Sequence, residues 1–75
     1  MIKVTIGDNV SSQVMIIPED TTIRQAFENA GIDYSRGMSN LDGATLKAGE
    51  LDKTFADFNI AEKCTLFNIA KTNNA

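Results

Sequence analysis

Seventy-five residues, 43% of them apolar and 23% charged, suffice for one small globular domain. Ten acidic and seven basic side chains give a net charge of −3, and the basic residues form no run, which argues against a nucleic-acid surface. The longest apolar run, residues 14–17, is too short for a membrane span or a signal peptide. The single cysteine, Cys64, excludes an internal disulfide. We therefore expect a cytoplasmic protein with no membrane insertion.

The N-terminal part predicts a β-hairpin. Residues 2–6 alternate apolar and polar side chains, which is typical of a half-buried strand. Residues 14–17 form a second apolar run, and Gly7-Asp8-Asn9 supplies the turn residues between the two strands. Pro18 ends the second strand, because proline has no backbone N–H to donate to a sheet.

A helix is predicted over residues 23–30. Thr22 suits the N-cap, and Gln25 three residues later completes a capping box. Gly31 follows the last helical residue, as is common where the chain must turn left-handed. Apolar residues recur at the spacing of one helical face: Ile23, Ala26, Phe27 and Ala30. A helix this short is unstable alone and must pack on the sheet.

A second hairpin is predicted around Asp42-Gly43, with strands over residues 38–41 and 44–46. Residues 47–53 are mostly polar and are expected to form a loop. Residues 63–69 predict a final strand, and the polar tail 71–75 is expected to fray.

A short helical turn is expected before the final strand. Thr54 is suited to cap it, with Asp57 three residues later as the reciprocal partner. Phe55, Phe58 and Ile60 are expected to point inward from this turn.

The predicted order, with strands and a single helix, indicates an α+β roll whose helix covers one sheet face. Three stretches resemble the ubiquitin-like β-grasp family: PEDTTI at 18–23, LDGATL at 41–46, and TFADFNI at 54–60 followed by CTL at 64–66. The resemblance implies one domain over residues 1–70, with a mixed four- to five-stranded sheet and one helix packed on one face. It also implies that the last strand is central and the second strand lies at an edge.

The C-terminal sequence departs from this family. Conjugated ubiquitins and the related sulfur carriers end in Gly-Gly, whereas no glycine follows Gly49 here. We therefore disfavour a sulfur carrier or protein modifier activated at its C-terminus, and keep it as an alternative.

Catalytic chemistry is poorly represented. Histidine, the commonest general base and metal ligand, is absent from the sequence. Cys64 therefore lacks the usual partner of a nucleophilic thiol, and its place in an alternating strand favours burial. The acidic residues form no calcium loop, and the glycines no phosphate-binding motif. We expect no enzyme activity, no metal and no cofactor.

The sheet face opposite the helix is the candidate binding site, because family members usually dock partners there. By the register of the resemblance, we expect this open face to present Lys3, Thr5, Met15, Ile17, Asn40, Phe67 and Ile69. Phe67 and Ile69 would anchor a protein partner, with Lys3 and Thr5 at the rim. Ubiquitin has an isoleucine at the position matching Asn40, so the resemblance implies a partner different from those that read that isoleucine.

Two alternatives concern the strands themselves. A one-residue slip of the last strand would bury Phe67 and Ile69 and turn Leu66 and Asn68 outward. That register would keep Asn68 out of the core, where an unpaired amide costs roughly 1–3 kcal/mol. In the favoured register, Asn68 is expected to reach water near the end of the strand. Separately, the second strand exposes unpaired backbone at the sheet edge, which would allow weak self-association.

Overall fold

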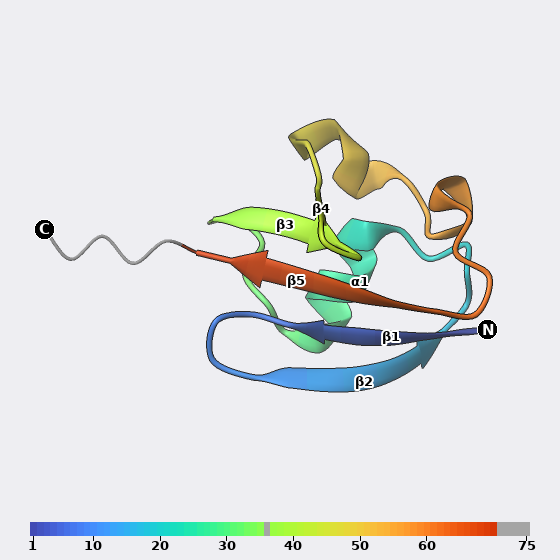
Figure 1. The fold of residues 1–75 in the computed structure, drawn as a ribbon, viewed down its shortest axis with the longest axis horizontal. Coiled ribbons are helices and arrows are strands. Elements are labelled where there is room, and N and C mark those ends of the chain that lie inside the picture. The colour runs from blue at the N-terminus through green and yellow to red at the C-terminus, as the bar shows by residue number, and fades with distance from the viewer. Residues whose placement is uncertain (36, 71–75) are drawn as a thin grey trace, which may run out of the picture.

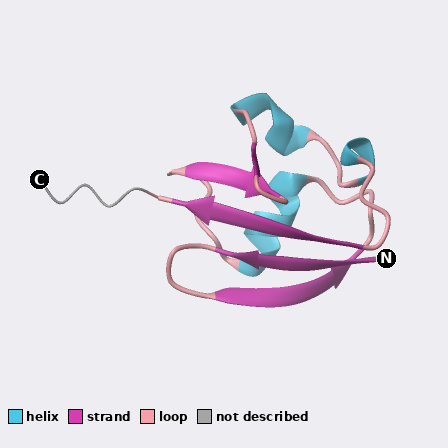
Figure 2. Cartoon of the chain, viewed as in Figure 1, coloured by secondary structure: helices cyan, strands magenta, loops and turns pink. Residues whose placement is uncertain are grey.

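The computed structural model describes residues 1–35 and 37–70, and the predicted fraying of residues 71–75 lies outside this part. The described chain belongs to the α+β class, with one α-helix and a five-stranded mixed sheet (Figure 1 and Figure 2). Its elements in order are β1 (Ile2–Gly7), β2 (Ser12–Ile17), α1 (Ile23–Ala30), β3 (Met38–Leu41), β4 (Ala44–Thr45), the 3₁₀ turns η1 (Ala48–Asp52) and η2 (Ala56–Phe58), and β5 (Lys63–Ile69).

The strands lie in the order β2-β1-β5-β3-β4. The central pair β1 and β5 is parallel, and the other neighbours are antiparallel. This order confirms that β5 is central and β2 lies at an edge. Helix α1 crosses behind the sheet in the view of Figure 1, so the sheet face toward the viewer has no helix over it.

The helix begins and ends where predicted. The Thr22 hydroxyl accepts a hydrogen bond from the backbone N–H of Gln25, and the Gln25 side chain accepts one from the backbone N–H of Thr22, both at 3.1 Å. Gly31 follows the helix with φ +74°, a left-handed conformation that glycine adopts without strain.

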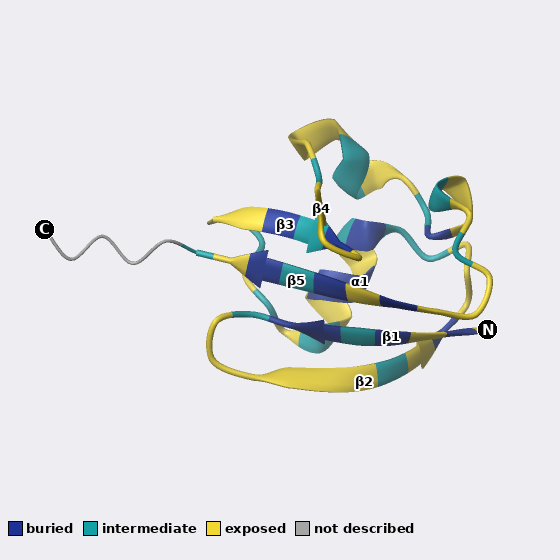
Figure 3. Cartoon of the chain, in the orientation of Figure 1, coloured by how far each residue is buried: buried dark blue, intermediate teal, exposed yellow. Residues whose placement is uncertain are grey.

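The core lies between α1 and the sheet, and Figure 3 shows buried segments along β1, β5 and the helix. Phe27 from the helix and Phe55 from the turn after η1 are its largest side chains, and both are fully buried. Phe58 and Ile60 are partly buried and pack against the same core, as expected. The remaining buried apolar residues are Ile2, Val4, Ile6, Ile17, Ile23, Ala26, Leu41, Cys64 and Leu66.

Two short-range predictions are confirmed in the second half of the chain. Asp42 and Gly43 both have positive φ, 51° and 86°, as the tight turn between β3 and β4 requires. Thr54 and Asp57 form the reciprocal cap: the Thr54 N–H donates to the Asp57 carboxylate at 2.9 Å, and the Asp57 N–H donates to the Thr54 hydroxyl at 3.1 Å.

The expected loop at residues 47–53 is wrong, because residues 48–52 form the 3₁₀ turn η1. Glu50 stabilises this turn by accepting a hydrogen bond from the Lys47 N–H at 2.8 Å. Leu51 is partly buried and packs against the core, so the turn has an apolar anchor within an otherwise polar segment.

Candidate interaction surface

Strand β5 alternates between the two sheet faces. Cys64 and Leu66 are buried on the helix side, at 5% and 0% exposure. Phe67 is half-buried and Ile69 is 40% exposed on the opposite side. The predicted outward orientation of Phe67 and Ile69 is therefore confirmed, and the slipped register is wrong.

The prediction that Asn68 reaches water near the end of the strand is wrong, because the residue is only 2% exposed. Its amide Nδ2 instead donates to the Oγ of Ser39 at 3.2 Å. Ser39 is its register partner on β3 and is itself buried. The buried amide is thus paired, which removes the desolvation penalty that favoured the slipped register.

The predicted orientation of β2 is wrong. Met15 and Ile17 pair with Val4 and Ile2 and face the helix, where Ile17 is 7% exposed within the core and Met15 packs against it. The outward positions of β2 belong instead to Val14 and Ile16, which are 54% and 59% exposed.

The turn between β1 and β2 explains this difference. The Asp8 N–H donates to the Ser11 carbonyl at 3.0 Å, which leaves Asn9 and Val10 as the turn. An odd-numbered residue of β1 then faces an even-numbered residue of β2: Lys3 pairs with Ile16, and Thr5 with Val14. Because paired residues share a face, the outward Lys3 and Thr5 direct Val14 and Ile16 outward.

An apolar cluster occupies the open face at the C-terminal end of β5, and we call Phe67, Ile69 and Met38 the Phe67 cluster. Met38 is the register partner of Ile69 and is 53% exposed. Gly37, with φ +70°, holds this junction, because a Cβ there would collide with the Ile69 carbonyl. We did not name Met38 as an outward residue from the sequence. Its orientation could have been predicted from Asn40, because residues two apart in a strand lie on the same face.

Asn40 lies beside the Phe67 cluster, as expected. It is the register partner of Phe67, and its side-chain oxygen accepts a hydrogen bond from the Thr45 hydroxyl at 3.1 Å. Lys3 and Thr5 also lie on the open face, opposite Lys63 and Thr65 on β5. On β1 and β5 the open face therefore has a polar, lysine-bearing end and an apolar end, and Val14 and Ile16 add exposed apolar side chains along the edge strand β2.

A hollow of about 400 Å³ lies at the polar end, lined by Lys3, Thr5, Asp42, Lys63, Cys64 and Thr65. The Asp42 carboxylate accepts a hydrogen bond from the Thr65 N–H at 2.8 Å. Burial, together with the negative charge of Asp42, raises the pKa of the Cys64 thiol to about 11. The thiol is therefore protonated at neutral pH, which does not suit a nucleophile.

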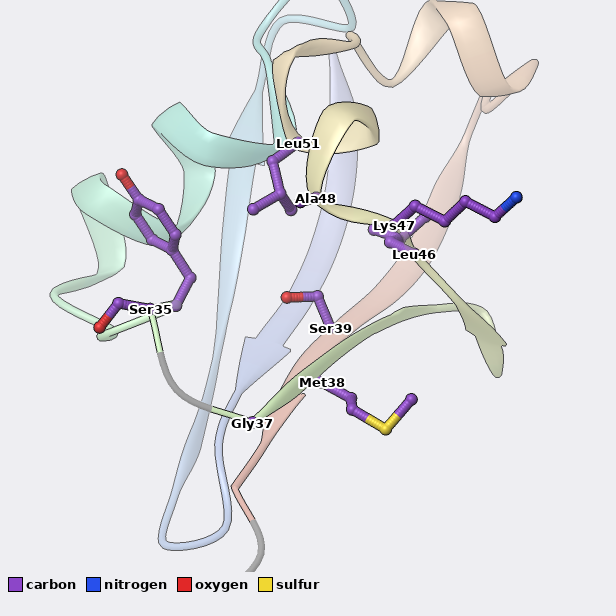
Figure 4. A pocket seen from close by; sticks show the side chains of 9 residues that line it. Ser35, Gly37, Met38, Ser39, Leu46, Lys47, Ala48 and Leu51 are labelled. Atoms are coloured by element: carbon purple, nitrogen blue, oxygen red, sulfur yellow. The ribbon is translucent and has the colours of Figure 1, made fainter.

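A second hollow, of about 230 Å³, lies between β3, η1 and the segment after the helix (Figure 4). Ser39 points toward this hollow, whereas Met38 points away on the other side of β3. The Tyr34 hydroxyl in its wall donates to Glu28 at 2.8 Å, and Ser39 already pairs with Asn68. The Tyr34 and Ser39 hydroxyls are thus engaged in holding the fold together.

Four further findings concern metal sites, membrane spans and similarity to known proteins. Within residues 1–35 and 37–70, no three His, Cys, Asp or Glu side chains gather where they could hold a metal ion. The helical segments of that same part are all too short or too polar to cross a bilayer. No protein-family model matches the chain, and a comparison with curated proteins finds no significant match.

Proposed function

We propose that the protein is a non-enzymatic, ubiquitin-like β-grasp module that binds a protein partner through its open sheet face. The central position of β5, the edge position of β2 and the single helix on one face support the β-grasp assignment. Phe67 and Ile69 are the proposed anchors, and Met38 extends them.

The Phe67 cluster is the observation that carries this proposal. Met38 and Ile69 expose large apolar side chains side by side, and the half-buried Phe67 lies next to them on β5. Leaving apolar surface in water costs about 25 cal/mol per Å², so a contiguous patch is unfavourable unless a partner covers it. An apolar partner segment seated here would recover that cost.

The surroundings of the cluster favour a particular kind of partner surface. Asn40 supplies a polar group beside Phe67, and Lys3 and Lys63 supply positive charge at the other end of the face. The five strands contain no Asp or Glu, although the whole chain carries a net charge of −3. A partner with an apolar centre and acidic rim would match this arrangement.

Quantitative affinity capture with the tagged protein tests the proposal. The Phe67→Ala/Ile69→Ala double variant should lose a specific set of partners that the wild type retains. The matched control is Val14→Ala/Ile16→Ala, which shortens two exposed apolar side chains on the same face but at the far edge strand. Thermal unfolding of all three proteins separates lost binding from lost folding. Equal capture by both variants, or unfolding of the Phe67→Ala/Ile69→Ala variant, would refute the proposal.

A further inference from the structure

The two edges of the sheet are protected very differently. Edge strand β4 is only two residues long, and short edge strands offer little backbone for another strand to pair with. Edge strand β2 has six residues, SQVMII, without a charged side chain or a proline. It therefore lacks the usual features that keep an edge strand from pairing with another chain.

Strand β2 also offers its backbone at regular intervals. The hydrogen bond from the Asp8 N–H to the Ser11 carbonyl marks one bonded pair of the hairpin. Bonded and non-bonded pairs alternate in an antiparallel ladder. Ser12, Val14 and Ile16 accordingly direct their N–H and C=O groups away from β1, toward the open edge.

We propose that two copies of the chain pair through β2, antiparallel and related by a two-fold axis beside Met15. Val14 of each copy then lies opposite Ile16 of the other on the open face, and the two five-stranded sheets become one. A shift by one residue would place open-face side chains against helix-side ones. A shift by two would set Ser12 opposite Ile16 in one direction and would leave only residues 15–17 paired in the other. The proposed register sets Val14 opposite Ile16 on both sides of the axis and keeps residues 13–17 of each strand paired.

The absence of charge on β2 favours a second copy as its partner, and the small contact area indicates that the copies bind weakly. Each chain carries −3 overall, yet the two would meet along strands that carry no charge. A six-residue strand is roughly 20 Å long, so the contact buries on the order of 400 Å² per chain. A standard interface buries about 800 Å² per partner, so we expect a reversible dimer that forms only at high concentration.

This dimer is independent of the proposed partner site. Strands β2 and β5 are separated by β1, and the Phe67 cluster lies at the β5–β3 end of the face. The Phe67→Ala/Ile69→Ala variant should therefore dimerise as the wild type does. Failure of the dimer and failure of partner binding can thus be told apart.

Sedimentation equilibrium up to millimolar protein tests the association. Val14→Lys should weaken the dimer about tenfold or more, because it places a charge opposite Ile16. Val10→Lys is the matched control, since Val10 is 90% exposed in the turn outside the paired strands. A monomeric mass at every concentration overturns the proposal. The edge of β2 would then be available only to a strand of another protein. An equal effect of both lysine variants also overturns the proposal.

Cross-linking tests the register, with Cys64→Ala as the background. Met15 lies opposite itself in a non-bonded pair, where Cα atoms are about 4.5 Å apart and a disulfide fits. Met15→Cys should therefore form a disulfide-linked dimer under mild oxidation with copper phenanthroline, and the Cys64→Ala background should not. Val14→Cys should cross-link poorly, because Val14 faces Ile16. Preferential cross-linking of Val14→Cys would overturn the register proposed here.

Discussion

At the C-terminal end of β5, the two sides of the strand carry side chains opposite to those that polarity alone would assign. Asn68 is buried against the helix-covered side, whereas its neighbours Phe67 and Ile69 lie on the open side. Asn68 tolerates burial because Ser39 on β3 pairs with its amide. The register of a strand thus follows from the combined burial of Cys64 and Leu66 and from a cross-strand partner, and the polarity of one residue does not decide it.

The largest expected effect concerns the helix-covered side. Phe55 is fully buried, so Phe55→Ala should cost about 3–5 kcal/mol through lost burial and a residual cavity. A domain this small is expected to have a stability of similar size, so the variant should be largely unfolded at 25 °C. Far-UV circular dichroism during urea titration measures this. A cooperative transition at the wild-type urea concentration would contradict the assignment of Phe55 to the core.

The buried amide gives the next effect. Asn68→Ala should destabilise the fold by about 1–3 kcal/mol, because the Ser39 hydroxyl loses its buried donor. In urea unfolding, Ser39→Ala and the double variant complete a double-mutant cycle. The double variant should cost less than the sum of the two single changes. Strictly additive costs would mean that the two side chains do not stabilise each other.

The helix cap should have a smaller effect. Thr22→Ala removes the hydroxyl that accepts from the Gln25 N–H and should cost about 1 kcal/mol. Thr21→Ala is the matched control, since the Thr21 hydroxyl makes no hydrogen bond among the described residues. Urea unfolding should separate the two variants, and equal stabilities would argue against the cap.

The smallest predicted effect depends on acid. Hydrogen bonds from Thr54 hold the pKa of Asp57 below its usual value, and those from the Val10 and Ser11 N–H groups do the same for Asp8. Because both pKa values are lowered by folding, the carboxylates stabilise the fold above about pH 4, and this contribution is lost as pH falls further.

Melting temperatures at pH 6 and pH 3 measure this loss. Asp57→Asn should narrow the difference in melting temperature between pH 6 and pH 3, because the asparagine does not titrate. Asp20→Asn, at a residue without an ion pair in the described chain, is the control. If the melting temperature falls as much between pH 6 and pH 3 in Asp57→Asn as in the wild type, Asp57 does not have this role.

Features with local causes could be predicted from the sequence. The Thr22 capping box, the left-handed Gly31 and the Asp42-Gly43 turn each depend on residues within one or two turns of chain. The burial of Leu66 and the outward orientation of Phe67 followed from the family resemblance, because alternation within β5 alone left both registers open.

Features that depend on the exact length of a turn, or on a residue distant in the sequence, could not be predicted as well. The face of Met15 and Ile17 depends on whether the β1–β2 turn holds an odd or even number of residues, and one residue reverses it. The partner of Asn68 lies 29 residues away on β3, so the alternation within β5 could not show how its amide is paired.

One comparison tests most directly whether the outward side of β5 is a contact surface and not core: urea unfolding of Leu66→Ala and Phe67→Ala. Leu66 is fully buried and should cost about 2–5 kcal/mol on truncation, whereas the half-buried Phe67 should cost only about 1–2 kcal/mol. A Phe67→Ala variant destabilised as much as Leu66→Ala would show that Phe67 supports the fold, and would contradict its role as a partner anchor.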